Sequence, residues 1–353
     1  MIGEAREGIA GRAARLCESA RIQTPASPLN TLNTERLLSV IVPAYNEEKL
    51  LGDTLVAIAH GLAGAGFAPE DWELRVTDNA STDATSAIAA AAGAAVVHEP
   101  QRQIARARNA GAAQAGGRWL LFVDADTRPS AGLLRATRAL MAPAGCCGAG
   151  ALVSPADAGA GVRLGIGCWN LVSRTLRLAC GAYVLCRSDA FRAIGGFNES
   201  LYAAEELDLS WRLRRWGRAH ALRFVIICDP RLDTSLRKLA LYSARELAGM
   251  ALRGLLHPYR ALRDPRYLAI GTMGGAERGV RPAACCDAPG RLAAGGAPTP
   301  LPDNSRWRAK NLTPLNWRVT RLVLAACGLV PVNGCRAAIV RTVDFRSNIS
   351  LDA

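Results

Sequence analysis

Short apolar runs alternate along residues 37–123 with longer segments whose apolar side chains recur every three or four positions. The short runs predict buried strands at 37–42, 73–77, 94–98 and 119–123, and the longer segments predict helices between them. We expect Pro43 to end the first strand. Strands that alternate with helices indicate an α/β fold with a Rossmann-like, mostly parallel central sheet flanked by helices.

The rest of the chain is less regular. Residues 1–36 read as an irregular extension, and the folded domain is expected over 37–233. The segment 234–270 holds a predicted basic amphipathic helix at 236–256, and 271–353 read as a poorly ordered tail with one short helix near 317–327. No signal-peptide pattern and no continuous apolar stretch of about 20 residues is present, so we expect no membrane span.

The net charge of the chain indicates which kinds of partner it binds. The chain has 43 basic and 30 acidic residues, for a net charge of +13, which favours phosphates, nucleotides or acidic lipids as partners. Aromatic residues make up only 5% of the sequence, so a stacking surface for nucleic acid is not expected. The eleven cysteines form no Cys-x-x-Cys pair and predict reduced thiols in a cytoplasmic protein.

Polar clusters follow three of the predicted strands. They are Ala44-Tyr45-Asn46-Glu47, Asp78-Asn79 and Asp124-Ala125-Asp126. In a parallel sheet these carboxyl ends meet at one edge, which is where ligands bind in open α/β folds. The three clusters together therefore predict a single binding site.

The Asp-x-Asp pair is the candidate metal site. In an extended segment, Asp124 and Asp126 would point to the same side. Two adjacent carboxylates suit a hard divalent cation, Mg²⁺ or Mn²⁺, which can bridge to a diphosphate. The alternative is that one aspartate caps a turn while the other is solvated.

Further acids offer binding and catalytic groups. Asp78 can accept hydrogen bonds from a base or a ribose, or it can cap the following helix together with Ser81. Glu205, Glu206 and Asp208 open a predicted helix. One of them, held near the others and partly desolvated, would have a raised pKa and could act as a general base. The alternative is that all three only complement the helix dipole.

Two segments near these acids carry further candidates. Arg106, Arg108 and Asn109 lie on a predicted helix just before the Asp-x-Asp strand, where a guanidinium can contact a pyrophosphate or simply face solvent. Gly195-Gly196-Phe197 predicts a turn before a loop that either closes over a sugar or only connects two elements.

These motifs together resemble the family 2 glycosyltransferases, which share the GT-A fold. The matching segments occur in the family's order: 40–48, 76–83, 107–111, 121–127, 195–199 and 205–213. The resemblance implies an inverting, metal-dependent transfer from a nucleoside-diphosphate sugar to an acceptor hydroxyl or a lipid phosphate. The Gln-x-x-Arg-Trp signature of processive synthases is absent, so transfer of a single sugar is expected.

The resemblance also assigns roles to individual residues. The nucleotide site would be lined by Pro43, Ala44, Tyr45, Glu47 and Asp78. Asp124 would contact the ribose or sugar, and Asp126 would ligate the metal. The base would be Glu206, where the family more often has aspartate. The extra methylene moves the carboxylate by about 1.5 Å, which leaves Glu205 and Asp208 open as the base.

Other functions remain open. A sugar-phosphate nucleotidyltransferase would carry a Gly-rich loop after the first strand, and a dinucleotide oxidoreductase would carry Gly-x-Gly-x-x-Gly there. This chain has Pro-Ala-Tyr-Asn-Glu at 43–47, without a glycine, which argues against both. A catalytically inactive nucleotide-sugar-binding or interaction module is the third alternative. The intact acids argue against it.

The sequence does not specify the donor sugar, the acceptor, the linkage or the oligomeric state. A UDP-sugar is the commonest donor in the resembled family, with GDP and dTDP also open. Trp169, Tyr183 and Trp211 offer a stacking surface for a sugar, although aromatics at such positions are more often core. The basic helix at 236–256 suggests peripheral contact with the inner membrane surface and a lipid-linked acceptor; the alternative is that it packs on the domain.

Overall fold

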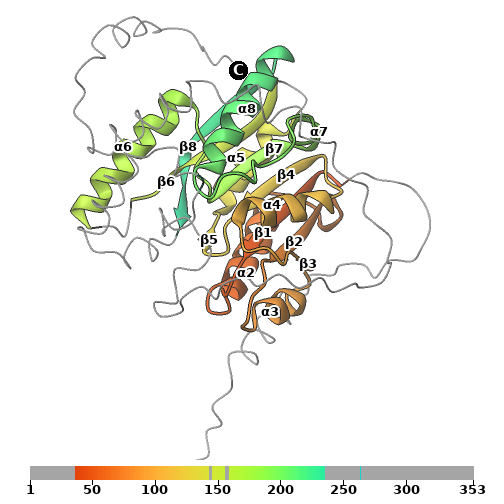
Figure 1. Cartoon of the computed structure of the whole chain (residues 1–353). Coiled ribbons are helices and arrows are strands. Elements are labelled where there is room, and N and C mark those ends of the chain that lie inside the picture. The colour runs from red at the N-terminus through yellow and green to blue at the C-terminus, as the bar shows by residue number, and fades with distance from the viewer. Residues whose placement is uncertain (1–35, 143–144, 156–158, 235–262, 264–353) are drawn as a thin grey trace, which may run out of the picture.

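The computed structural model describes residues 36–142, 145–155, 159–234 and Arg263 (Figure 1). The extension over 1–35, the predicted amphipathic helix at 236–256 and the tail over 271–353 lie outside the described residues. In the described part of the chain, no helix combines the length and the hydrophobicity that a membrane span needs.

One eight-stranded sheet forms the centre of the fold, in the order β3-β2-β1-β4-β7-β6-β8-β5. The expected architecture, an α/β fold with a mostly parallel sheet, is confirmed: β3, β2, β1 and β4 are parallel, as are β6 and β8. The strand β7 runs antiparallel between β4 and β6, and β5 pairs antiparallel with β8. The strands are β1 Leu38–Ala44, β2 Trp72–Asp78, β3 Ala95–His98, β4 Trp119–Val123, β5 Thr127–Arg128, β6 Cys146–Val153, β7 Tyr183–Arg187 and β8 Arg223–Thr234.

The first strand does not end at Pro43, as we expected, but continues to Ala44. On one side β1 pairs with β2 as far as Ala44 and Asp78. On the other side its pairing with β4 stops at Ile41. Beyond Ile41 the strand therefore has a neighbour on one side only, and proline is tolerated in a strand where no ladder bond requires its missing N–H.

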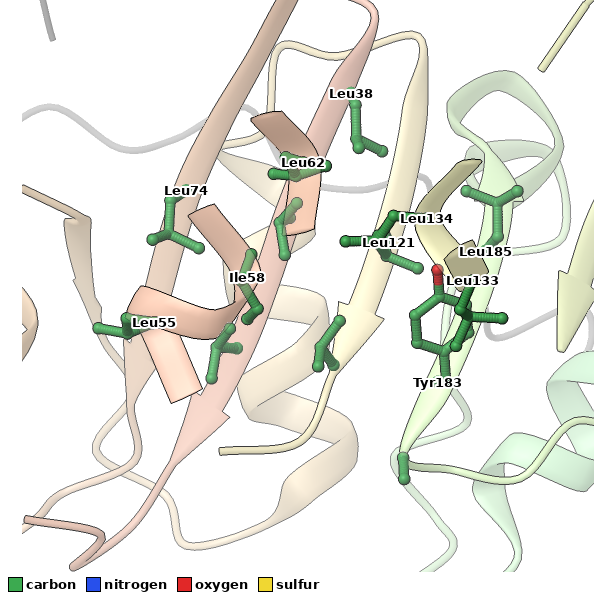
Figure 2. Packing of buried hydrophobic residues seen from close by; sticks show 14 of the residues in the cluster. Leu38, Leu55, Ile58, Leu62, Leu74, Leu121, Leu133, Leu134, Tyr183 and Leu185 are labelled. Atoms are coloured by element: carbon green, nitrogen blue, oxygen red, sulfur yellow. The ribbon is translucent and has the colours of Figure 1, made fainter. Parts of the chain in front are cut away.

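Helices cover both faces of the sheet (Figure 1). They are α2 Leu51–Gly64, α3 Thr85–Ala91, α4 Ile104–Ala113, α5 Ala131–Leu140, α6 Ala160–Leu176, α7 Ser188–Ala193 and α8 Glu205–Ala219, with a short 3-10 turn at Pro69–Asp71. On one face, Figure 2 shows Leu55, Ile58 and Leu62 of α2 packed against the strands. The helices α4, α7 and α8 contribute to the core on the other face.

Alternating side chains explain why the central strands need helices on both faces. In β4, Leu121 and Val123 belong to the core under α2 and α5, whereas Leu120 and Phe122 belong to the core under α4, α7 and α8. A strand that is buried on both faces reads as a continuous apolar run, which is how the sequence revealed it. The two cores hold the carboxyl ends of β1, β2 and β4 at one edge of the sheet.

Candidate active site

The loops after β1 and β2 are joined to each other by hydrogen bonds. The Asn46 backbone N–H donates to the Ser81 hydroxyl (3.1 Å), and the Thr82 N–H donates to the Asn46 side-chain oxygen (2.8 Å). The Glu47 N–H donates to the Thr85 hydroxyl at the start of α3 (2.9 Å). These bonds fix the two loops as one rigid wall, so Ser81 links the loops and does not cap α3.

Asp78 lies at the end of β2 within this wall and is buried. One carboxylate oxygen accepts a hydrogen bond from the Ser81 N–H (2.9 Å), and the other accepts one from the Ser86 hydroxyl (2.5 Å). Burial raises the pKa of Asp78, whereas these hydrogen bonds and the nearby His98 lower it. The lowering is the larger effect, so the pKa stands below the ordinary value. Asp78 is therefore a stable anion.

The other residues expected to line a nucleotide site differ in what they present. Pro43 and Ala44 are buried inside β1 and can offer only backbone atoms. Glu47 is also buried, at 9% exposure. Tyr45 lies beneath the guanidinium of Arg102, whose carbon is 4.6 Å from the ring centre. The cation and the ring together form a surface on which a flat group can stack.

Asp124 and Asp126 follow β4 in a turn, not in the extended segment that we expected. The Thr127 N–H donates to the Asp124 carbonyl (3.0 Å), which closes the turn. The Asp124 side chain is 21% exposed, and Asp126 is 8% exposed. The turn therefore replaces the geometry of alternating side chains, although both carboxylates stay at the end of the strand.

Arg108 of α4 joins the acids from two distant segments. Its guanidinium, only 1% exposed, donates to Asp124 (2.9 Å), to Glu205 (2.7 Å) and to the carbonyl of Gly181 (2.9 Å). It is held inside the protein and is not part of a solvated helix face, which was one of the two alternatives; its contact with a pyrophosphate stays a prediction. Burial lowers the pKa of Arg108, but the surrounding carboxylates raise it above the ordinary value, so the residue is a fixed cation.

Glu206 lies beside this cluster, at the first turn of α8. Its carboxyl carbon would be only 3.4 Å from a β-carbon on Gly181, so the side chain lies against the loop before β7. Its pKa is raised to about 8. Burial is the main cause, the negative charge of Glu205 raises the pKa as well, and the positive charge of Arg108 offsets part of the rise. A carboxyl group with this pKa can exchange a proton near neutral pH, as a general base must.

Asp208 has a different partner, although it is one helical turn from Glu205. Its carboxylate accepts a hydrogen bond from Arg212 on the same helix (2.7 Å). Arg212 also donates to the carbonyl of Ile194 at the end of α7 (2.8 Å). Of the three acids considered as the base, Glu205 and Asp208 are thus both held by arginines through short hydrogen bonds.

Asn109 anchors the Gly-Gly-Phe loop and does not lie on a solvated helix face. Its side chain donates to the Phe197 carbonyl (3.0 Å) and accepts from the Phe197 N–H (2.9 Å). A β-carbon on Gly196 would lie 2.7 Å from the same side-chain oxygen, and Gly196 has a φ of +67°. Only glycine meets both conditions, so the predicted turn is confirmed and its loop is fixed to α4.

The sequence did not reveal that Gly181 accepts a hydrogen bond from Arg108 or that Asn109 holds the Gly-Gly-Phe loop. For the burial of Arg108 one signal was present: Ala105, Arg108 and Ala112 are spaced as one helix face, which predicts that the arginine points inward with the alanines. The suggested stacking surface is partly wrong, because Tyr183 is fully buried and its hydroxyl bonds to Thr137 (2.7 Å). The side chain of Tyr183 completes the core beside α5 (Figure 2).

The donor set at the end of β4 fits a hard divalent cation. Both Asp124 and Asp126 offer carboxylate oxygens, which Mg²⁺ and Mn²⁺ prefer. Among the described residues, no group of three or more His, Cys, Asp or Glu side chains is placed to hold a metal ion. A cation here would therefore take its remaining ligands from a diphosphate and from water.

Several known proteins are similar to part of this chain in sequence or in structure. The pre-mycofactocin glycosyltransferase of Mycobacterium tuberculosis is 27% identical over 235 residues, covering 60% of this chain and 46% of the relative. A mannosyltransferase from Pyrobaculum calidifontis, solved with GDP-Man and Mn²⁺, is 19% identical, with a TM-score of 0.48 and 69% of each chain covered. Staphylococcus aureus TarS 1-349, solved with UDP-GlcNAc, is 22% identical, with a TM-score of 0.44 and coverage of 56% and 58%.

The chain thus spans about half the length of the curated relative that it matches. The model of the family described as glycosyl transferase family 2 matches residues 39–152, which include the ends of β1, β2 and β4. This segment holds Asp78, Arg108 and both aspartates of the turn. Over these residues, the chain is similar to glycosyl transferase family 2.

Proposed function

We propose that the domain over 37–233 transfers a single sugar from a nucleoside-diphosphate sugar to an acceptor hydroxyl, with inversion. The observation that carries this proposal is the position of Glu206, a carboxyl group with a raised pKa, beside the Arg108 cluster that includes Asp124. The raised pKa suits proton transfer at Glu206, and the acids of the β4 turn suit a donor diphosphate. The family match to residues 39–152 supports the same reaction class.

In this proposal Glu206 takes the proton from the acceptor hydroxyl. The acceptor oxygen then attacks the anomeric carbon, and the bond from that carbon to the diphosphate oxygen breaks. The electron pair of that bond leaves with the nucleoside diphosphate. Attack from the side opposite the leaving group gives inversion, so one base is sufficient.

The donor would lie along the edge formed by the ends of β1, β2 and β4. Tyr45 beneath Arg102 suits the flat base, and ionised Asp78 can accept hydrogen bonds from the base or the ribose. Asp126, with Asp124, would hold a divalent cation at the diphosphate. When bound, such a cation neutralises the charge that develops on the leaving group.

Arg108 has a positioning role in this proposal. It holds Asp124 from β4 and Glu205 from α8 on one guanidinium, so the metal-binding turn and the helix of the base keep a fixed separation. Its positive charge also limits how far the neighbouring acids raise the pKa of Glu206. Without it, the carboxylates of the cluster would repel one another.

Offering the protein a panel of UDP-, GDP- and dTDP-sugars, with release of nucleoside diphosphate as the readout, tests this function. We expect turnover of one donor in Mn²⁺, with a UDP-sugar as the first candidate. Binding without turnover by any donor would favour the inactive binding module, and release of pyrophosphate from a nucleoside triphosphate would favour a nucleotidyltransferase.

The metal requirement has its own test. Donor binding should need a divalent cation in the wild type and should be weak in Asp126→Ala both with Mn²⁺ and with EDTA. Equal donor affinity of both proteins under both conditions would rule out the role of Asp126. Asp53→Ala is a matched control, because Asp53 pairs with Arg128 at the surface and lies outside the proposed donor site.

A further inference from the structure

A cavity of about 260 Å³ lies on α8, further along the helix than the acids. It is lined by Trp211, Arg214, Arg215 and Arg218. Three guanidinium groups therefore border one small cavity, and a tryptophan ring forms its apolar wall. The reaction proposed above assigns no role to these residues.

Within the part of the chain that the structure describes, no carboxylate neutralises the positive charges of this cavity. Among the described residues, none of the three arginines forms an ion pair with a carboxylate, unlike Arg212 and Arg108. The guanidinium of Arg214 donates to the carbonyl of Leu176 at the end of α6. The site thus concentrates guanidinium donors, with no carboxylate partner among the described residues.

Like charges crowd Arg214 further. Burial lowers its pKa, and the positive charges of Arg218 and of Arg177, at the end of α6, lower it again. Three cations this close repel one another unless an anion lies between them. The helix dipole favours a cation only in the last turn, where Arg218 lies, so it does not explain Arg214 and Arg215.

The chemistry of the lining defines the ligand. Guanidinium groups donate in a planar fork that matches the oxygens of a phosphate. The guanidinium carbon of Arg215 lies 5.9 Å from the centre of the Trp211 ring, so the cation and the ring are neighbours in the lining. An anion that carries a ring or an apolar group next to its phosphate would use both parts.

We propose that this cavity binds a phosphate-bearing group of the acceptor. The assignment to the acceptor rests on the proposed transferase function, whereas the binding of phosphate does not. Since an α-helix rises 1.5 Å per residue, Arg214 lies about 12 Å along α8 from Glu206. The acceptor would then be held by its phosphate at a distance from the hydroxyl that reacts.

Binding of inorganic pyrophosphate to the full chain, measured by calorimetry in EDTA, tests the site. Without a divalent cation, the acids of the β4 turn repel the probe. We expect Arg214→Gln/Arg218→Gln to bind pyrophosphate about tenfold more weakly or worse, because charge-assisted hydrogen bonds are lost. Arg215→Gln/Arg218→Gln should show the same loss while it keeps the Arg214 bond to Leu176, which controls for a folding defect.

The matched control is Arg118→Gln/Arg192→Gln, which removes two exposed arginines outside the cavity and changes the net charge equally. It should bind pyrophosphate within about twofold of the wild type, because two distant surface charges are largely screened. Glu206→Gln should also bind like the wild type. Loss of sugar transfer and loss of phosphate binding are thereby measured separately.

A second arm distinguishes a free phosphate from a lipid headgroup. Flotation with vesicles of phosphatidylcholine containing phosphatidic acid should fall in both cavity variants, but not in the control, if the phosphate belongs to a lipid. Pyrophosphate binding without flotation would assign the site to a soluble phosphate compound. Equal binding of both probes by wild type, cavity variants and control, or no binding of either probe by the wild type, would overturn the proposal.

Discussion

Two carboxyl groups at the same edge of the sheet have opposite electrostatic surroundings. Asp78, at the end of β2, receives hydrogen bonds from Ser81 and Ser86, and its pKa stands below the ordinary value. Glu206, at the start of α8, is buried beside Glu205, and its pKa rises to about 8. Pairs of acids whose pKa values are pushed apart in this way are typical of sites that need both a permanent anion and a proton acceptor.

The difference lies in what each side chain meets on burial. Both groups are desolvated, which disfavours the charged form in each case. The loop after β2 then supplies N–H and O–H donors to Asp78, whereas α8 supplies a second carboxylate to Glu206. Donors, more than depth, decide which of two buried acids stays ionised.

The largest effect on stability should come from replacing Arg108, the cation that pairs with both Glu205 and Asp124 beside Glu206. Arg108→Gln leaves Glu205 and Asp124 without their ion-pair partner, and breaking a buried pair in this way costs about 3–5 kcal/mol. We expect the free energy of unfolding, measured in urea at pH 7, to fall by that amount.

Arg106→Gln on the same helix is the matched control, because its pair with Glu199 is partly exposed. Surface pairs of this kind contribute about 0–1 kcal/mol. If the two variants lost the same stability, Arg108 would not be the residue that holds the acids together.

The next largest effect is the loss of turnover when Glu206 can no longer accept a proton. Glu206→Gln keeps the shape of the side chain but cannot accept a proton, so we expect turnover to fall about 10²-fold or more, the usual contribution of a general base. Donor binding should stay unchanged, since the nucleotide contacts lie on the other loops. Single-turnover rates and donor affinity measure the two effects.

The competing assignments are read from Glu205→Gln and Asp208→Asn. A near wild-type rate for Glu206→Gln, with either of these variants inactive, would move the base to the other acid. In the wild type, kcat/KM should also rise with pH up to about 8, because the free enzyme must lose the Glu206 proton before it can act.

The raised pKa of Glu206 also predicts a smaller effect, in which the stability of the fold depends on pH. The folded pKa of Glu206, about 8, lies above the ordinary value of 4.5, so between these pH values the folded protein holds a proton that the unfolded chain has released. The stability from this group is therefore present below pH 4.5 and is lost as the pH rises through about 8.

Glu206→Gln removes this loss, so the variant should melt above the wild type at pH 8.5 and close to it at pH 5. A difference of one pH unit between folded and unfolded pKa is worth about 1.4 kcal/mol. In a domain of this size that raises the midpoint by roughly 3–6 °C, and we expect at least this rise. Thermal unfolding at both pH values measures it; a wild type that is the more stable protein at pH 8.5 would contradict it.

The smallest effect tests the other acid. Ser86→Ala removes one donor to Asp78, which should cost about 1 kcal/mol of stability at pH 7. Because the folded pKa of Asp78 is lowered, its stabilisation is present above its ordinary value of 3.8 and disappears as the pH falls through the folded pKa.

The loss in Ser86→Ala should therefore shrink as the pH falls from 7 to below the ordinary Asp78 pKa of 3.8. Ser200→Ala, which removes an exposed hydroxyl that donates to its neighbour Asn198, is the control and should change stability by less than about 0.5 kcal/mol. An equal loss at both pH values would mean that Ser86 supports the fold without acting on the Asp78 carboxylate.

The sequence by itself determined the first half of the sheet. Strands buried on both faces must read as apolar runs, so β4 was predicted at 119–123, the bounds the structure gives, and β1, β2 and β3 to within two residues. It did not reveal β6, whose Gly and Ala residues have low strand propensity. The strands β7 and β8 were also missed, although Tyr183–Arg187 and the start of β8 at Arg223 carry the apolar run of a buried strand. It also identified the acids at the strand ends, since parallel strands carry their carboxyl ends to one edge.

Only the tertiary structure decided how those acids differ. Packing places Arg108 between Asp124, which follows β4, and Glu205 of α8. Local sequence does not record which charges become neighbours when segments far apart in the chain pack together. A pKa depends on those neighbours and on burial, both of which arise only when the two cores close around the sheet.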